Sequence, residues 1–219
     1  MDDERHGLRR PCREVAFTGR PRRPGDHQKE VMLPVLETQR LLLREWRDHD
    51  RAPFARLNAD PMVMEHFPAT LSVEESNAFV DSIEAAWANG FGLWAVEDRT
   101  TGEFIGYTGF ASPSFQTSFT PCIEIGWRFA AHTWGAGRAT EAARAAIDWA
   151  TKNLRAPRDE IVSFTTTGNM RSRRVMEKIG LVRDETADFD HPRLPHWEHK
   201  RHVLYRRSMV DLRRPDPSR

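Results

Sequence analysis

The stretch Cys122-Ile-Glu-Ile-Gly-Trp-Arg-Phe-Ala130 and the turn Trp134-Gly-Ala-Gly-Arg-Ala-Thr140 that follows it decide the fold. The first run predicts a strand in which Glu124 lies on the face opposite its two isoleucine neighbours, because successive side chains of a strand alternate. Beyond the turn, apolar residues recur at helical spacing and predict an amphipathic helix over about Thr140 to Leu154. A strand, a glycine turn and a helix therefore succeed one another directly.

The glycine turn has the features of an anion site. Gly135 and Gly137 stand just ahead of the helix, where free backbone N–H groups and the helix dipole can hold an anion. Pyrophosphate is the natural occupant, and Arg138 adds a charge-assisted contact from the same turn. The turn has neither the Gly-Lys-Ser/Thr of a P-loop nor the spacing of a dinucleotide-binding fingerprint. Taken alone, it is also compatible with a plain strand-to-helix connection.

The chain before this stretch predicts strands and helices in alternation. The expected elements are a strand centred within Leu36–Trp46, helices over Asp48–Leu57 and Ser72–Asn89, and strands over Leu93–Glu97 and Phe104–Phe110. The second helix opens with Ser72 and Glu75, which form a capping box. The polar, glycine-containing loop between the last two strands predicts an antiparallel pair.

The chain after the stretch completes one domain. Glu160–Thr166 predicts a strand, Gly168-Asn169 leads into a helix that ends at Gly180, and His202–Arg206 predicts the last strand. We expect the folded domain over residues 35–209, with residues 1–34 as a disordered extension and 210–219 as a charged tail. Since Met32 stands directly before the first strand pattern, a native start there is a hypothesis.

Composition excludes several function classes. The chain has 39% hydrophobic and 30% charged residues, which is typical of a soluble globular protein, and no run approaches the roughly 20 apolar residues of a membrane helix. The net charge of +1 provides no overall field for a polyanion, so nucleic acid is not an expected partner. Only Cys12 and Cys122 are present, which predicts no structural disulfide and a cytoplasmic protein. The sequence does not choose between a monomer and a homodimer.

The strand, the turn and the helix start at Asn169 resemble the GNAT acetyltransferase superfamily, and more closely its branch of ribosomal-protein alanine N-acetyltransferases. The motifs that carry the likeness are Leu41–Arg44, Glu124–Trp127, Trp134–Gly137, Ala139–Ala142 and Asn169–Gly180. The likeness covers nearly the whole chain after Val35. It implies an α/β (α+β) GNAT fold, with a mixed, mostly antiparallel sheet flanked by helices and acetyl-CoA in the cleft between the two central strands.

The resemblance also implies which residues bind acetyl-CoA. They are Ile125, Trp127, Trp134, Gly135, Ala136, Gly137, Arg138, Ala139, Thr140 and Asn169. In the superfamily the amides of the turn bind the CoA pyrophosphate, and its first position is Gln or Arg, where this chain has Trp134. Backbone N–H groups near Ile125 and Trp127 would polarise the thioester carbonyl, and Asn169 would lie near the CoA arm. A turn-forming role is the alternative for Asn169.

For catalysis the resemblance implies direct attack of a neutral amine on the thioester. Glu124 matches the mid-strand acidic position that deprotonates the amine in some relatives, although an exposed strand carboxylate is the alternative. Many relatives protonate the thiolate with a Tyr seven residues after the Asn, but here that position is Met176. Ser172 is the expected substitute, a helix-capping Ser is its alternative interpretation, and Tyr205 is a weaker candidate.

The segment Asp188-Phe-Asp-His-Pro192 raises two further possibilities. In the resembling branch a similar loop borders the acceptor cleft, so Asp190 and His191 are expected to bind the amine substrate or to stabilise the loop. Carboxylates and histidines are also zinc ligands, but no metal spacing is present, and we expect no metal. Trp94, Trp127 and Trp149 are expected in the core.

These observations predict an N-acetyltransferase that moves an acetyl group from acetyl-CoA to a primary amine in a ternary complex. The acceptor is a protein N-terminus or a small molecule, and the sequence does not select one. Because Met176 replaces a familiar acid and a fold does not guarantee activity, a catalytically inactive CoA-binding regulatory module is the alternative.

Overall fold

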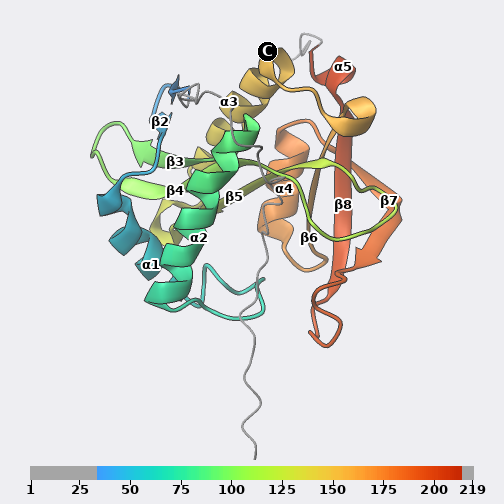
Figure 1. Ribbon diagram of the computed structural model, residues 1–219, viewed down its shortest axis with the longest axis horizontal. Coiled ribbons are helices and arrows are strands. Elements are labelled where there is room, and N and C mark those ends of the chain that lie inside the picture. Colours follow the sequence, from blue (N-terminus) through green and yellow to red (C-terminus); the bar gives the residue numbers. More distant parts are fainter. Residues whose placement is uncertain (1–33, 214–219) are drawn as a thin grey trace, which may run out of the picture.

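One mixed sheet forms the centre of the molecule (Figure 1). The computed structural model describes residues 34–213, so the predictions for nearly all of the N-terminal extension and for most of the charged tail lie outside it. In spatial order the strands of the described part are β1 (Leu36–Glu37), β2 (Leu41–Arg44), β3 (Leu93–Asp98), β4 (Phe104–Ala111), β5 (Ile123–Phe129), β6 (Glu160–Thr166), β8 (Arg201–Ser208) and β7 (Val182–Asp190). Every neighbouring pair is antiparallel except β5 and β6, which are parallel. The predicted mixed, mostly antiparallel sheet is confirmed.

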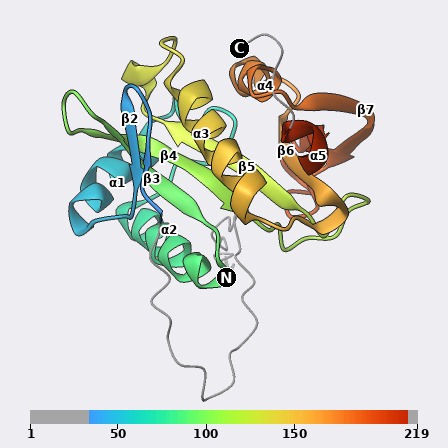
Figure 2. The ribbon, with the colours of Figure 1, turned by 90° about the horizontal axis from the view of Figure 1, so that it is seen from above.

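Helices flank this sheet, as expected. They are α1 (Arg51–Ala59), α2 (Val73–Ala86), α3 (Arg138–Asn153), α4 (Met170–Lys178) and α5 (Met209–Leu212), with short 3-10 turns at Asp48–Asp50, Trp87–Asn89, Ala131–Thr133 and Pro157–Asp159. Figure 2 shows α1 and α2 on one side of β3, β4 and β5, and α3 on the other. The capping box is confirmed, because the Glu75 N–H donates to Ser72 Oγ over 3.2 Å and the Ser72 N–H donates to the Glu75 carboxylate over 2.8 Å.

Three elements of this fold were not predicted from the sequence. The strand expected at the centre of Leu36–Trp46 is β2, and the short strand β1 pairs with it as a hairpin, because Thr38 Oγ1 accepts the Leu41 N–H and turns the chain. β7 lies in a segment where we expected only a loop, because its acidic and exposed residues conceal the strand pattern. A short helix, α5, follows the last strand; Ser208 caps it, and Met209 at its start is fully buried.

The core packs on both faces of the sheet. Trp94 is fully buried, and its ring meets Trp87 and Trp149 edge to face at centroid distances of 4.8 and 5.1 Å. Such aromatic contacts add to the apolar area that is removed from water. Trp94 therefore belongs to the core, as expected, whereas Trp127 and Trp149 are partly buried and pack against it, and Trp127 also lines a cleft.

Candidate functional site

A cleft opens where the two central strands separate. β5 and β6 keep parallel register only at Ile123 with Ile161 and at Glu124 with Val162. Beyond that point a cleft of about 410 Å³ lies between them. The expected site residues on its wall are Glu124, Trp127, Trp134, Gly135, Gly137, Arg138, Ala139, Thr140, Asn169 and Ser172.

Backbone N–H groups of β5 point into this gap. Ser163 Oγ on β6 donates to the Ile125 carbonyl over 2.8 Å, and Thr108 Oγ1 on β4 donates to the Gly126 carbonyl over 3.0 Å. Because the N–H and C=O of a strand residue point to the same side and neighbours alternate, the N–H groups of Ile125 and Trp127 face β6. Ile125 contributes only its backbone, since its side chain is fully buried.

The glycine turn after β5 presents open backbone to the cleft. Gly135 and Gly137 have φ values of +79° and +78°, a left-handed conformation that glycine adopts readily and other residues rarely adopt. No atom lies within 4 Å of where a Gly135 Cβ would stand, so this face of the turn is accessible to a ligand. α3 begins at Arg138, and the N–H groups of its first turn have no partner inside the helix. The turn therefore offers several donors to one anion.

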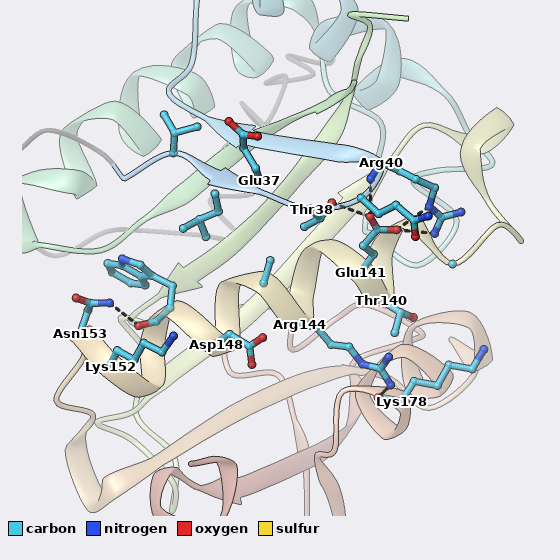
Figure 3. Close-up of a pocket in the computed structure, with 16 residues that line it drawn as sticks. Glu37, Thr38, Arg40, Thr140, Glu141, Arg144, Asp148, Lys152, Asn153 and Lys178 are labelled. Carbon is cyan, nitrogen blue, oxygen red and sulfur yellow. Dashed lines mark hydrogen bonds and ion pairs between the residues drawn. The ribbon is translucent and has the colours of Figure 1, made fainter. Parts of the chain in front are cut away.

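A network that sequence reasoning missed supports this turn from behind. Glu141 on α3 accepts from Thr38 Oγ1 over 2.6 Å and from Arg40 Nε over 2.7 Å. Arg40 Nη1 also donates to the Ala136 carbonyl over 2.9 Å, and Figure 3 shows these side chains converging at the start of α3. Ala136, expected to contact CoA, therefore faces Arg40 and is not on the cleft wall.

Two other expected CoA-binding side chains already have protein partners. Arg138 donates to Asp98 Oδ2 from Nη2 over 2.9 Å and from Nε over 3.2 Å, and this guanidinium lowers the pKa of Asp98. Trp134 Nε1 donates to the Phe129 carbonyl over 2.9 Å, and the Arg171 guanidinium lies 4.5 Å from its ring centroid. Both side chains hold the turn in place while they line the cleft.

The start of α4 forms the opposite wall. Asn169 is the N-cap of this helix, because its Oδ1 accepts the Ser172 N–H over 3.0 Å. Its Nδ2 donates to Thr165 Oγ1, also over 3.0 Å, so the alternative structural role of Asn169 is present. Asn169, and not Ser172, is the cap. The cleft is therefore lined by a Ser172 side chain that the N-cap hydrogen bond does not use.

Glu124 lies on the cleft wall near the last paired residues of β5 and β6. Its charge acts on the neighbouring Cys122, whose pKa is raised to about 12 by burial first and by Glu124 second. The thiol therefore stays protonated near pH 7. Tyr205 and Met176 lie elsewhere: both are buried, and the Tyr205 hydroxyl donates to Glu177 over 3.0 Å.

The expected acceptor residues lie behind the cleft. His191 is 2% exposed, its ring centroid is 4.8 Å from that of Phe115, and burial lowers its pKa to about 4. Asp190 is 3.4 Å from Arg201 and 3.7 Å from Lys200, in ion pairs outside the cleft. In this structure neither residue lines the cleft, because the segment that we expected as a loop joins β7 and packs against β8.

Two histidines that sequence reasoning missed line the cleft instead. His66 Nδ1 is 3.1 Å from Thr166 Oγ1, and His202 Nδ1 is 2.7 Å from the Lys200 carbonyl, to which it donates. Burial lowers the pKa of both imidazoles. They are therefore neutral near pH 7, and His202 keeps Nε2 as an acceptor.

A second hollow, of about 840 Å³, runs along α3 beside the β1–β2 hairpin. It shares Gly137, Thr140 and Lys178 with the cleft, so the two meet at the start of α3. Figure 3 shows Arg144 and Lys178 together at this junction, where Arg144 Nη2 donates to the Lys178 carbonyl over 2.7 Å. Two basic residues, Arg144 and Lys178, thus lie close to the glycine turn.

Residues 34–213 contain neither a metal-binding cluster nor a membrane-spanning helix. No cluster of three or more His, Cys, Asp or Glu there could hold a metal ion. No helix in that part of the chain has the length and apolar character to span a membrane.

Comparisons with known proteins agree with this geometry. Residues 40–182 match the model of the acetyltransferase (GNAT) domain. The protein YkkB of Bacillus subtilis (strain 168) is 33% identical over 153 residues, which are 69% of this chain and 87% of YkkB. The crystal structure of an acetyltransferase from Agrobacterium tumefaciens is 27% identical with a TM-score of 0.64, covering 84% of this chain and 99% of that one. A ribosomal-protein-S5-alanine acetyltransferase from Vibrio fischeri shares the fold, with a TM-score of 0.60 and 17% identity over 83% of this chain and all of that chain.

Proposed function

This chain belongs to the GNAT acetyltransferase family, and from that membership we propose that it transfers an acetyl group from acetyl-CoA to a primary amine. The family prediction from the sequence is thereby confirmed. The observation that carries the proposal is the cleft between β5 and β6, which joins inward-facing N–H groups to an anion-binding turn. Acetyl-CoA fits that arrangement, because its thioester and its pyrophosphate lie at separate positions along one extended molecule.

Acetyl-CoA would lie along the whole cleft. The pyrophosphate would bind the N–H groups at Gly135, Gly137 and the start of α3, where the helix dipole favours an anion. Lys178 and Arg174 line the same cleft and add positive charge. The thioester carbonyl would then accept from the N–H groups of Ile125 and Trp127. These fixed donors would stabilise the oxyanion of the tetrahedral intermediate.

In the proposed reaction Glu124 acts as the general base. It removes a proton from the acceptor ammonium, directly or through a water, and the free amine attacks the acetyl carbon. A C–N bond forms and the C–S bond breaks. Glu124 passes the first proton to bulk water, and the second amine proton replaces the one that is given to the departing thiolate. Ser172 is the proposed donor to the departing CoA thiolate, because its side chain faces the cleft. A thiol with a pKa of about 8.5 also leaves readily unaided.

The carboxylate and the neutral histidines lie beside the apolar residues Met62, Val63 and Phe67 on the acceptor side of the cleft. We propose an amine acceptor there, either a protein N-terminus or a small molecule. Since Cys122 is a free, buried thiol, a reducing cytoplasm is the proposed compartment.

Calorimetric titration with acetyl-CoA tests the proposal, with a Gly137→Glu variant beside the parent protein. The new carboxylate would repel the pyrophosphate, and we expect an affinity loss of about 100-fold or more. Gly102→Glu is the matched control, because Gly102 also has a positive φ, +71°, in open space but lies in the β3–β4 loop. No binding by the parent protein would refute the proposal. Release of CoA with a panel of amines then separates an enzyme from an inactive CoA-binding module.

A further inference from the structure

Arg128 is a buried cation on the acceptor side of the cleft. It lies on β5 four residues after Glu124, on the same face of the strand, and lines the cleft while only 7% exposed. Its Nη1 donates to Asn58 Oδ1 over 2.6 Å, and its guanidinium carbon lies 4.0 Å from the Phe67 ring centroid. The Nε atom of Arg128 is buried and has no hydrogen-bond partner. Every one of these neighbours is neutral.

Arg44 is a second buried arginine of this chain, and its hydrogen-bond partners can be compared with those of Arg128. Arg44 is 3% exposed, and it binds both Asp50 oxygens over 2.7 and 2.9 Å and Glu97 over 2.7 Å. Two carboxylates therefore neutralise it. Within the described residues no ion pair involves Arg128, although its burial is similar. A buried charge without a counterion is costly, so a ligand anion is the expected partner.

We propose that Arg128 binds a carboxylate of the acceptor, so that the substrate is an amine that also carries a carboxylate, as an amino acid or a short peptide does. This inference depends on the proposed acetyl transfer, because it extends the same cleft. A guanidinium has five N–H donors in a fork that matches a carboxylate. The aromatic rings around Arg128 keep water away and strengthen that pairing.

The spacing along β5 refines the substrate class. Four residues of strand separate the Cα atoms of Glu124 and Arg128 by about 13 Å, a span that two long side chains shorten. The reacting amine and the carboxylate are therefore several bonds apart. The apolar side chains of Met62, Val63 and Phe67 line the same cleft and suit an aliphatic spacer. An ω-amino acid or a short peptide fits better than an α-amino acid.

The experiment compares 6-aminohexanoate with hexylamine, which present the same amine with and without a carboxylate. CoA release gives kcat/KM for each, and we expect the parent protein to prefer the acid by about 10-fold or more. Arg128→Met should remove this preference, and Arg128→Lys should retain part of it. Arg47→Met is the control, because Arg47 is an exposed arginine that does not line the cleft, and it should keep the parent ratio.

Equal use of the two amines by the parent protein would overturn the inference, as would an unchanged preference in folded Arg128→Met. Titration of the CoA-saturated protein with each amine measures the same preference without turnover. That titration still decides on Arg128 if no amine releases CoA, an outcome that would count against the proposed acetyl transfer itself. A merely structural Arg128 would lower thermal stability and leave the ratio between the two amines unchanged.

Discussion

The two halves of the cleft are built in different ways. On the CoA side the expected ligands are backbone N–H groups in one continuous segment, from Trp134 into the first turn of α3. On the acceptor side the groups are side chains from three separate parts of the chain, with Glu124 and Arg128 on β5, His66 before α2 and His202 on β8. A backbone site is determined by local geometry, whereas a side-chain site requires the whole fold. Side-chain truncations should therefore damage the acceptor side more than the CoA side.

The largest effect that this contrast predicts is at Glu124. Glu124→Gln keeps the shape and removes the base, so kcat should fall by about 10²- to 10⁴-fold. The dissociation constant of acetyl-CoA should change little, because the proposed donors to that ligand are backbone N–H groups. Steady-state CoA release and calorimetry measure the two quantities. Glu103→Gln, at an exposed position in the β3–β4 loop, is the control.

Parent-like activity in Glu124→Gln would rule out this base. A loss of acetyl-CoA affinity as large as the loss of kcat would contradict the proposed difference between the two sides. Glu124, a side chain on the acceptor side, would then also contribute to acetyl-CoA binding.

The same contrast explains what the sequence predicts. The strand, turn and helix of the CoA side are contiguous, so hydrophobic spacing and two glycines are enough to locate them. Arg40 and Glu141 are 101 residues apart, and no local pattern links them before β2 packs beside α3. His66 lies in a loop whose path depends on α1 and α2, so its approach to Thr166 has no local signal.

The acceptor side also shows where local inference fails. The motif that contains Asp190 and His191 predicted an acceptor-binding loop. In the structure β7 extends to Asp190, and neither residue lines the cleft. The acidic residues of Val182–Asp190 hide the alternation by which a strand is recognised. Arg128 was part of the quoted strand, yet its lack of a carboxylate partner becomes evident only when its tertiary neighbours are known.

A second prediction concerns the aromatic cluster behind the acceptor side. Burial, and then electrostatic interaction with His202 and Arg193, lowers the pKa of His191 from 6.5 to about 4. Between these values the unfolded chain binds more protons than the folded one, so the free energy of unfolding decreases as the pH falls. This single group should account for about 2 kcal/mol between pH 7 and pH 5.

His191→Leu should therefore reduce the pH dependence of unfolding by about that amount, as measured by urea denaturation at the two pH values. His49→Leu, at an exposed position, is the control and should keep the parent difference. Unchanged pH dependence in His191→Leu would mean that the folded protein accommodates a charged His191. The aromatic cluster around His191 would then make no pH-dependent contribution to the free energy of unfolding.

The smallest expected effect is on the CoA side, at Asn169. Its amide is already used by the Ser172 N–H and by Thr165, so Asn169→Ala should act through the helix cap and lower the free energy of unfolding by about 1 kcal/mol. Ser72→Ala removes the cap of α2, which lies away from the cleft, and should cost a similar amount. Because the proposed CoA ligands are backbone groups, acetyl-CoA affinity should change by less than about 3-fold in Asn169→Ala and not at all in Ser72→Ala. Calorimetry that showed a 10-fold loss for Asn169→Ala alone would make this side chain a direct ligand of the CoA arm. Acetyl-CoA binding on the CoA side would then depend on the Asn169 side chain as well as on backbone N–H groups.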